Sequence, residues 1–380
     1  MRLAMLTNMV PPYRQPMFEA LARIERGELL VLTLARSEKN RAWSLPDSAS
    51  VRQVVVPGRH VFIGERDWAL HVNRSVAGVL AGYRPDVLVI GGYDSPAQWE
   101  ALLRARATGL PTVLWSGSHA YSSRSRSRLV LGLKRLFVRQ CDAFLAYGTL
   151  AAQYLVTLGA APTRIVTGIN AADASFFGAP SPERSFHRAW GGGQFRAIAC
   201  CSAQLIERKG IDVAIEAMSR VDENVALWVV GDGPLRPRYE QLARDRAPGR
   251  VFFLGHHEYE ELPAIYGAAD FFVLPSRREV WGLVVNEAMA AGRPVIATRG
   301  CGATADLIEG RNTGIAVEPD DPKALADAIN VLARDDSQRA AMGARARELV
   351  QRCDTTAYAE AMHCAAEIAR GSRRPGRRAA

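Results

Sequence analysis

The sequence predicts an α/β protein of two doubly wound domains, each with a parallel sheet that helices cover on both faces. Three observations favour this fold class. Short apolar runs alternate with stretches of helical periodicity, and the runs are continuous rather than interrupted by polar residues. The pattern starts again after a Gly-Gly-Gly segment at 191–193. The 380 residues are 48% hydrophobic and 23% charged, which suits two or three globular domains and excludes disordered, collagen-like and small disulfide-rich proteins.

The expected strands form two sets. In the first half they are 3–6, 29–34, 51–56, 87–90, 112–115, 143–146 and 165–166, and in the second half 197–201, 227–230, 251–254, 271–274, 295–297 and 314–317. Helical stretches between buried strands predict parallel crossovers, whose ligands bind at the carboxyl ends of the strands. With two such domains, the expected binding site is the cleft between them.

The domain boundaries follow from composition. Residues 179–195 are rich in Pro, Ser and Gly and are predicted to link an N-terminal domain, 1–178, to a C-terminal domain, 196–352. A helix is expected over 353–370, packing back toward the N-terminal domain. The basic tail 371–380 is expected to be disordered.

The two halves of the chain differ in charge. Residues 1–180 hold 21 Lys and Arg against 12 Asp and Glu, a net charge of +9, whereas residues 181–380 hold 27 of each.

The six cysteines form no C-x-x-C pair, so reduced thiols and a cytoplasmic protein are expected. The first apolar stretch is too short for a signal peptide, and the uncharged stretch 143–163 fits a strand and a helix better than a membrane span.

The most informative region is 271–289, FFVLPSRREVWGLVVNEAM, which reads as a strand, a loop and a helix. The helix is expected to begin near Gly282 and Leu283, where its first N–H groups suit a phosphate. Glu279 on the loop and Glu287 in the helix are carboxylates, which accept hydrogen bonds from vicinal hydroxyls. A phosphate-binding helix start together with two carboxylates that accept hydrogen bonds from hydroxyls would suit a nucleotide sugar as the ligand. The alternative is that both glutamates are solvated surface residues.

A basic loop, QLIERKG at 204–210, follows the strand 197–201. Gly210 permits an unusual backbone at the turn, and Lys209 is one of four lysines in a chain whose other basic residues are arginine. Its ammonium would be a point charge for a departing diphosphate, whereas the alternative is an ordinary solvated loop.

The loop GDGPL at 231–235 suggests a dinucleotide fingerprint. However, Arg236 stands where the last glycine of that motif is required, so no dinucleotide site is predicted.

The chain resembles the retaining glycosyltransferases of family 4, which have the GT-B fold. The resemblance rests on GDGP at 231–234, on LGHHEYEELPAIYGAADFFVLPSRREVWGLVVNEAMAAGRPVIAT at 254–298 and on GRNTGIAVEPDDPKALADAI at 310–329. It is strong over 197–350 and looser before. It implies two Rossmann-like domains facing a central cleft and a metal-independent hexosyltransferase, for which a nucleotide sugar is a substrate rather than a cofactor.

The resemblance also assigns roles. Three residues are catalytic: Lys209 on the diphosphate, Glu279 on hydroxyls of the donor sugar, and His119, in WSGSHA at 115–120, near the sugar. The alternative for His119 is an ordinary loop histidine. The donor-binding residues it implies are Gln204, Arg208, Gly282, Leu283, Val284 and Glu287, the last on the ribose.

The chain departs from the family pattern at two places. Gln204 stands where the family has arginine, so one fixed charge is missing from the phosphate site, and Arg208 is expected to compensate. The loop after the first strand reads VPPYR at 10–14 instead of being glycine-rich, and Tyr13 and Arg14 are expected on the acceptor side. No D-x-D occurs, the motif that holds a divalent cation in the other common glycosyltransferase fold, so no metal site is predicted.

A basic amphipathic helix is expected over 122–140, SSRSRSRLVLGLKRLFVRQ, which has six basic residues and no acid. Leu129, Val130, Leu133, Leu136 and Phe137 share one of its faces. One interpretation is a helix that lies on an anionic inner membrane surface. The other is a domain helix whose apolar face lies in the core.

The sequence therefore predicts sugar transfer from a UDP- or GDP-sugar to a hydroxyl, with lipid-linked or polysaccharide precursors as acceptors and no nucleic-acid partner. Two alternatives remain open: a nucleotide-sugar epimerase on the same fold, and a non-catalytic protein that binds a nucleotide sugar. A phosphorylase of this fold would need a pyridoxal lysine, for which no lysine is well placed.

Overall fold

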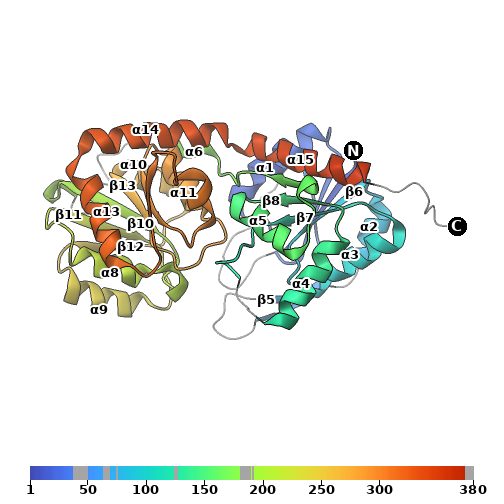
Figure 1. Cartoon of the computed structure of the whole chain (residues 1–380), viewed down its shortest axis with the longest axis horizontal. Helices are drawn as coiled ribbons and strands as arrows, with labels where there is room; N and C mark the ends of the chain where they lie inside the picture. Colours follow the sequence, from blue (N-terminus) through green and yellow to red (C-terminus); the bar gives the residue numbers. More distant parts are fainter. Residues whose placement is uncertain are drawn as a thin grey trace. The chain divides into compact units, whose positions relative to one another are not determined.

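The computed structural model describes residues 1–36, 50–62, 69–73, 76–123, 127–179, 190 and 192–372. The chain forms two compact units. Met1–Ile169 and the chain from Thr355 onward make the first, and Asn170–Asp354 makes the second (Figure 1). Most of the predicted linker 179–195 and of the tail 371–380 lies outside the described residues. No helix of the described residues combines the length and the apolar character needed to cross a bilayer.

The first unit contains a seven-stranded parallel sheet in the order β3-β2-β1-β6-β7-β8-β9. Each strand lies where the sequence predicts one. The inner strands are continuous apolar runs buried on both faces of the sheet, whereas the edge strands β3 and β9 are partly exposed. The strands are β1 (Leu3–Thr7), β2 (Leu29–Thr33), β3 (Arg52–Val55), β6 (Val87–Gly91), β7 (Thr112–Ser116), β8 (Ala143–Ala146) and β9 (Ile165–Thr167).

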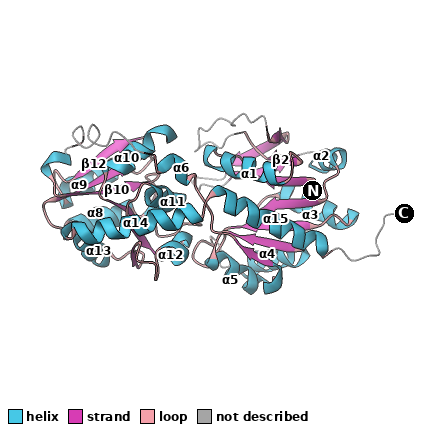
Figure 2. Ribbon diagram, turned by 90° about the horizontal axis from the view of Figure 1, so that it is seen from above, coloured by secondary structure: helices cyan, strands magenta, loops and turns pink. Residues whose placement is uncertain are grey.

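Helices flank both faces of this sheet (Figure 2). One face packs in a common core with α2, α3, α4 and α5, while α1 and α15 pack against each other and α15 also contacts β6 to β9. The helices are α1 (Gln15–Ile24), α2 (Val76–Tyr83), α3 (Pro96–Thr108), α4 (Arg128–Gln140), α5 (Thr149–Leu158) and α15 (Thr355–Gly371).

A hairpin of β4 (Gly58–Phe62) and β5 (Ala69–Asn73) was not predicted. Its strands mix polar and apolar residues and lack the continuous apolar runs used to find the others. Asn73 fixes its base, because Nδ2 donates to Leu34 O at 2.8 Å and to Val56 O at 2.7 Å.

The second unit contains a six-stranded parallel sheet in the order β12-β11-β10-β13-β14-β15. The sequence predicts its six strands and their parallel arrangement, but not this order. Its strands are β10 (Ala197–Ser202), β11 (Val225–Val230), β12 (Val251–Gly255), β13 (Phe271–Leu274), β14 (Val295–Thr298) and β15 (Gly314–Val317). Its helices are α6 (Ala174–Phe177), α8 (Ile211–Met218), α9 (Arg236–Arg246), α10 (Leu262–Ala268), α11 (Leu283–Ala290), α12 (Gly302–Leu307), α13 (Pro322–Arg334) and α14 (Asp336–Arg352).

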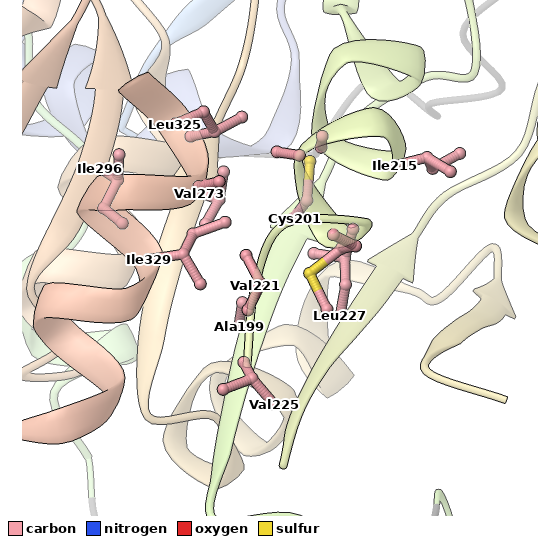
Figure 3. Close-up of a cluster of buried hydrophobic side chains, with 14 of the residues drawn as sticks. Ala199, Cys201, Ile215, Val221, Val225, Leu227, Val273, Ile296, Leu325 and Ile329 are labelled. Atoms are coloured by element: carbon pink, nitrogen blue, oxygen red, sulfur yellow. The ribbon is translucent and has the colours of Figure 1, made fainter. Parts of the chain in front are cut away.

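A buried apolar cluster joins one face of this sheet to α8 and α13 (Figure 3). Alternate strand residues such as Ala199 and Cys201 point into it, as period-two geometry requires. Ile215 comes from α8, and Leu325 and Ile329 come from α13. This core holds the strand ends, and therefore the loops after β10 and β13, in fixed positions.

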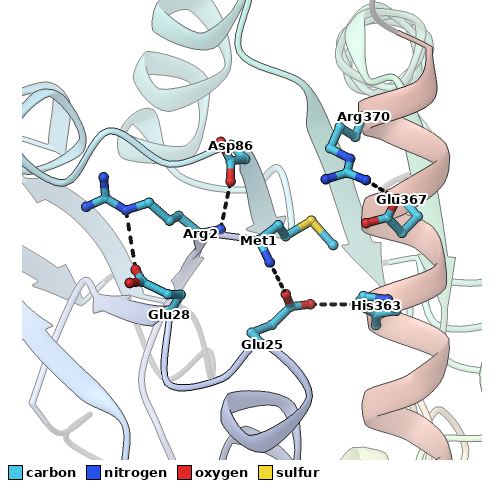
Figure 4. A network of polar contacts seen from close by, with 8 residues as sticks. All are labelled: Met1, Arg2, Glu25, Glu28, Asp86, His363, Glu367 and Arg370. Atoms are coloured by element: carbon cyan, nitrogen blue, oxygen red, sulfur yellow. Dashed lines mark hydrogen bonds and ion pairs between the residues drawn. The ribbon is translucent and has the colours of Figure 1, made fainter.

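The helix α15 belongs to the first unit although it follows the second in the sequence. Polar contacts tie it to the opposite end of the chain (Figure 4). Glu25, which is buried, pairs with His363 Nδ1 at 2.6 Å and with the amino group of Met1 at 2.8 Å. Tyr358 accepts a hydrogen bond from Trp115 Nε1 at 2.8 Å.

The division between the units falls after Ile169, earlier than the predicted linker. Residues just past that point pack on the second unit. Asn170 O accepts from Asn286 Nδ2 at 3.0 Å, and α6 contacts α11. The stretch 170–178 is therefore anchored by contacts that its composition does not reveal.

Candidate functional site

Two loops of the second unit meet at the carboxyl ends of adjacent strands. The loop 203–210 follows β10, and the loop 275–282 follows β13, its neighbour in the sheet. Because both strands are parallel, their following loops emerge at the same edge. The backbone N–H of Arg277 donates to Arg208 O at 2.9 Å, so the two loops are joined directly.

Gly210 lets the first loop fit tightly against the end of β13. It adopts φ +66°, a left-handed conformation, between a short 3₁₀ turn at Glu207–Lys209 and α8. A Cβ at this position would lie 2.2 Å from Pro275 O. Only glycine combines this φ with so close a backbone approach.

The charged side chains of the two loops converge. Glu279 forms an ion pair with Lys209 Nζ, and Arg208 Nη1 lies 3.3 Å from Glu279 Oε2. The side chains of Lys209 and Glu279 are only 15% and 14% exposed. This burial contradicts the reading of both as solvated loop residues. The structure thus brings together two cations and one carboxylate that are about 70 residues apart.

The start of α11 lies beside this cluster. Its N-cap residue, Gly282, has φ +90°, no side chain of the described residues caps the helix, and its first turn holds no acidic residue. A Cβ on Gly282 would lie 3.3 Å from Glu279 Cγ and 2.8 Å from Cys301 Sγ. An uncapped helix N-terminus has N–H groups and a positive dipole end available to an anion, and here they belong to half-buried Leu283 and Val284.

Glu287 lies one turn further along α11 and is buried, with 5% exposure. It is therefore not the surface residue of the alternative interpretation. Tyr266 Oη, also buried, donates to Glu287 Oε2 at 3.1 Å. Desolvation by burial raises the pKa of Glu287 to about 7, although the hydrogen bond from Tyr266 lowers it. The carboxyl therefore gains and loses its proton near neutral pH.

Sequence reasoning missed the residues that support the two loops. Arg277 Nη2 lies 2.7 Å from Asp212 Oδ2, and Arg277 Nε lies 2.6 Å from Asp320 Oδ1. On the other side, Glu279 N–H donates to Gly300 O at 3.0 Å, and Cys301 Sγ donates to Trp281 O at 2.6 Å. These partners lie up to 65 residues away along the chain, and no spacing pattern connects them.

The remaining predicted donor residue, Gln204, is half-buried in the loop after β10. Its carbonyl accepts from Ile206 N–H at 2.9 Å, which tightens the start of the turn.

The three other predicted residues lie in the first unit. His119 is buried in the loop after β7, where its backbone N–H donates to Ser122 Oγ at 2.8 Å. Arg14 ends the 3₁₀ turn that precedes α1 and is 8% exposed. Its guanidinium lies 5.0 Å from the ring centre of Trp115 and 5.8 Å from that of Tyr13. Arg14 thus stacks among aromatic rings of its own unit.

Gly210→Ala should reduce the free energy of unfolding by about 2–4 kcal/mol, because the left-handed φ and the clash with Pro275 O both oppose a Cβ. Gly249→Ala is the matched control: Gly249 has φ +73°, but no atom of the described residues lies within 4 Å of its Cβ position. The control should lose only about 1–2 kcal/mol from the unfavourable φ. Urea unfolding measures both variants. Equal losses would show that the contact with Pro275 contributes nothing.

Two family models match the chain. The model described as "Glycosyl transferases group 1" matches residues 185–349, and the model described as "Glycosyl transferase 4-like domain" matches residues 12–170. Together they cover most of the chain, and the first contains both loops of the site.

Curated relatives match part of the chain. The D-inositol 3-phosphate glycosyltransferase of Corynebacterium urealyticum is 46% identical over 114 residues, which are 30% of this chain and 27% of that protein. The GDP-mannose-dependent alpha-(1-6)-phosphatidylinositol monomannoside mannosyltransferase of Mycolicibacterium smegmatis is 35% identical over 163 residues, 40% of this chain and 42% of that protein. Each alignment spans less than half of the relative's length.

The likeness in fold extends over the whole chain. The crystal structure of Anabaena HepE in complex with UDP aligns with 96% of this chain and 98% of its own, with a TM-score of 0.76 and 18% identity. At this identity the match shows the fold alone. From the two matched models and this likeness, we conclude that the chain belongs to the group 1 glycosyltransferases, family 4, and has the GT-B fold.

Proposed function

We propose that the chain is a retaining glycosyltransferase that moves a sugar from a UDP- or GDP-sugar to an acceptor hydroxyl. The observation that carries this proposal is the ion-paired cluster of Lys209, Arg208 and Glu279 beside the uncapped start of α11. Two cations and a helix N-terminus suit a diphosphate, and the carboxylate between them suits sugar hydroxyls. The matched family models support the reaction class.

In this proposal each group has one role. Lys209 and Arg208 bind the diphosphate together with the N–H groups of Leu283 and Val284. Glu279 accepts hydrogen bonds from hydroxyls of the transferred sugar, and Glu287 accepts them from the ribose. Because the ion pair already fixes Lys209 and Glu279, less side-chain entropy is lost when the donor binds.

The transfer step exchanges two bonds at one carbon. The bond between the anomeric carbon and the diphosphate oxygen breaks, and the acceptor oxygen forms a bond on the same face of that carbon. The acceptor proton passes to the departing phosphate oxygen. Negative charge grows on the diphosphate as it leaves, so the fixed cations and N–H groups stabilise the transition state more than the ground state. We propose that these groups perform the charge neutralisation that a divalent cation provides in other glycosyltransferases.

The proposed acceptor is a lipid-linked sugar or a polysaccharide precursor in the cytoplasm. The name of the Mycolicibacterium smegmatis relative specifies phosphatidylinositol monomannoside, a lipid-linked sugar, and supports an acceptor of this class. We propose that His119, Tyr13 and Arg14 of the first unit serve the sugar and acceptor side.

A thermal-shift screen tests the donor class. A ligand that binds only the folded chain stabilises it by about 2.7 kcal/mol at 100 times its Kd, so UDP- or GDP-sugars should raise Tm by several degrees. Product analysis then separates the activities. A transferase consumes the donor when an acceptor is present, an epimerase converts the donor alone, and a binding protein does neither. Absence of a shift with every nucleotide sugar would contradict the proposal.

A further inference from the structure

The helix α4 exposes a row of leucines. Leu129 is 74% exposed, Leu133 48% and Leu136 50%, whereas only Phe137 and Val138 of the helix are fully buried. The alternative interpretation, a domain helix whose apolar face lies in the core, therefore does not hold for these three leucines. At 100° per residue, positions i, i+4 and i+7 lie within about 60° of one another, so they form one continuous stripe.

Arginines form an adjacent stripe on the same helix. Arg128, Arg135 and Arg139 are exposed, and they lie about 100° around the helix axis from the leucines. In the part of the chain that the structure describes, no ion pair includes any of the three. Arg124 and Arg126 of the expected helix lie outside the described residues.

Lys134 shows that the other side of the helix faces the protein. Its Nζ donates to Ser123 Oγ at 3.2 Å and lies 5.4 Å from the ring centre of Tyr93 and 5.8 Å from that of Tyr154. The helix therefore has three sides: one packed on the first unit, one of exposed leucines and one of exposed arginines.

We propose that the Leu129, Leu133 and Leu136 stripe and its arginines dock this unit onto an anionic lipid bilayer. The charge of the chain favours an anionic bilayer as the binding partner of this surface, because the segment 122–140 has no acidic residue and residues 1–180 carry a net charge of +9. Leucines enter the boundary between headgroups and acyl chains while the neighbouring arginines contact lipid phosphates. The inference goes beyond the proposed transfer reaction and would bring the enzyme to a lipid-linked acceptor.

Vesicle flotation tests this with the full chain and without donor or acceptor. The chain should float with vesicles of phosphatidylcholine and phosphatidylglycerol, bind neutral phosphatidylcholine vesicles at least tenfold less, and dissociate in high salt. Replacing the three leucines with serine, or the three arginines with glutamine, should each reduce binding at least tenfold. These side chains are exposed, so circular dichroism should show unchanged folding.

The matched control is Leu103→Ser, a leucine on α3 that is 63% exposed. It should float like the wild type. Equal lack of binding to both vesicle types, or binding that the leucine variant retains, would overturn the proposal. A concentration-dependent dimer that the leucine variant abolishes would also overturn it, because the stripe would then contact a second copy. None of these results depends on glycosyl transfer.

Arg277 contacts both residues that precede Lys209 in the loop after β10. Its Nη1 donates to Glu207 O at 2.5 Å, and its backbone N–H donates to Arg208 O at 2.9 Å. Its guanidinium also donates to both carboxylate oxygens of Asp212, at 2.9 and 2.7 Å. Arg277 thus holds the two residues before Lys209 while its own position is fixed by an ion pair.

We infer that Arg277 is a positioning residue for Lys209, an inference that rests on the proposed function. Lysine at 277 would keep the charge but lose the planar fork that reaches Asp212 and Glu207 together. The expected result for Arg277→Lys is a kcat at least tenfold lower per folded molecule, with a smaller change in KM.

Arg299→Lys is the matched control, because Arg299 also contacts two carboxylates, Glu309 at 2.6 Å and Glu318 at 3.0 Å, away from Lys209. Both variants should lose similar amounts of Tm, but only Arg277→Lys should lose kcat. Wild-type kcat in Arg277→Lys, or equal kcat losses in both variants, would overturn the inference. If the wild type itself neither binds nor uses a nucleotide sugar, the proposed function fails instead.

Discussion

Lys209→Ala is expected to lower kcat by about 10²–10³-fold while changing the KM for the donor much less, as removal of one preorganised charge at a leaving group does. The reason is that the diphosphate gains negative charge only as it departs, and the Lys209 ammonium is already held in place by Glu279. Steady-state kinetics with the donor identified by thermal shift measure both constants.

Lys323→Ala controls for the loss of a lysine as such. Lys323 lies on α13, is 75% exposed and pairs with its helix neighbour Asp327, so kcat should not change. A Lys209→Ala enzyme with normal kcat and only weaker donor affinity would contradict the transition-state role.

Glu287→Gln should make the chain more stable at pH 8 and weaken donor binding. The pKa of Glu287 is raised from 4.5 to about 7 in the folded state, mainly by desolvation. Between these values the folded chain keeps a proton that the unfolded chain has lost, so the free energy of unfolding falls as pH rises. Below pH 4.5 the carboxyl is protonated in both the folded and the unfolded chain, so its burial causes no loss of stability. Above pH 7 the folded chain must hold a buried charged carboxylate, which lowers the free energy of unfolding by about 3 kcal/mol.

Glutamine keeps the shape and still accepts the hydrogen bond from Tyr266, but it never ionises. The variant should therefore gain about 2–4 kcal/mol over the wild type at pH 8 and little at pH 5. Its donor affinity should fall, because a carboxylate accepts from both ribose hydroxyls more strongly than an amide does.

Urea unfolding at pH 5 and pH 8 measures this effect, with Glu348→Gln on α14 as the control. Glu348 is 63% exposed, so its replacement should change stability little at either pH. Equal stability of Glu287→Gln and the wild type at pH 8 would contradict a buried carboxylate that is charged at that pH. A gain in stability with unchanged donor affinity would contradict its role on the ribose.

The sequence predicts the sheets well because buried parallel strands have a distinctive pattern. Runs such as 197–201 and 271–274 are apolar throughout, and both are strands in the structure. The hairpin β4–β5 lacks that pattern and was missed. A strand buried on both faces can be predicted from the sequence, because its residues form a continuous apolar run.

The candidate site is only partly predictable. Lys209 and Glu279 each follow a predicted strand, but that β10 and β13 are neighbours is a property of the sheet order, which periodicity does not contain. The contact of Arg277 with Asp212 depends on the same order. Glu287 and the leucines of α4 show the same limit: helical spacing groups residues on a face, but it does not say whether that face is covered.

The most direct test of the central claim is a crystal structure of the chain with a nucleoside diphosphate. The account predicts phosphate oxygens within hydrogen-bond distance of Lys209 Nζ and of the N–H groups of Leu283 and Val284, with the ribose hydroxyls on Glu287. A diphosphate bound elsewhere on the second unit, with the Lys209–Glu279 ion pair undisturbed and apart from the nucleotide, would contradict it.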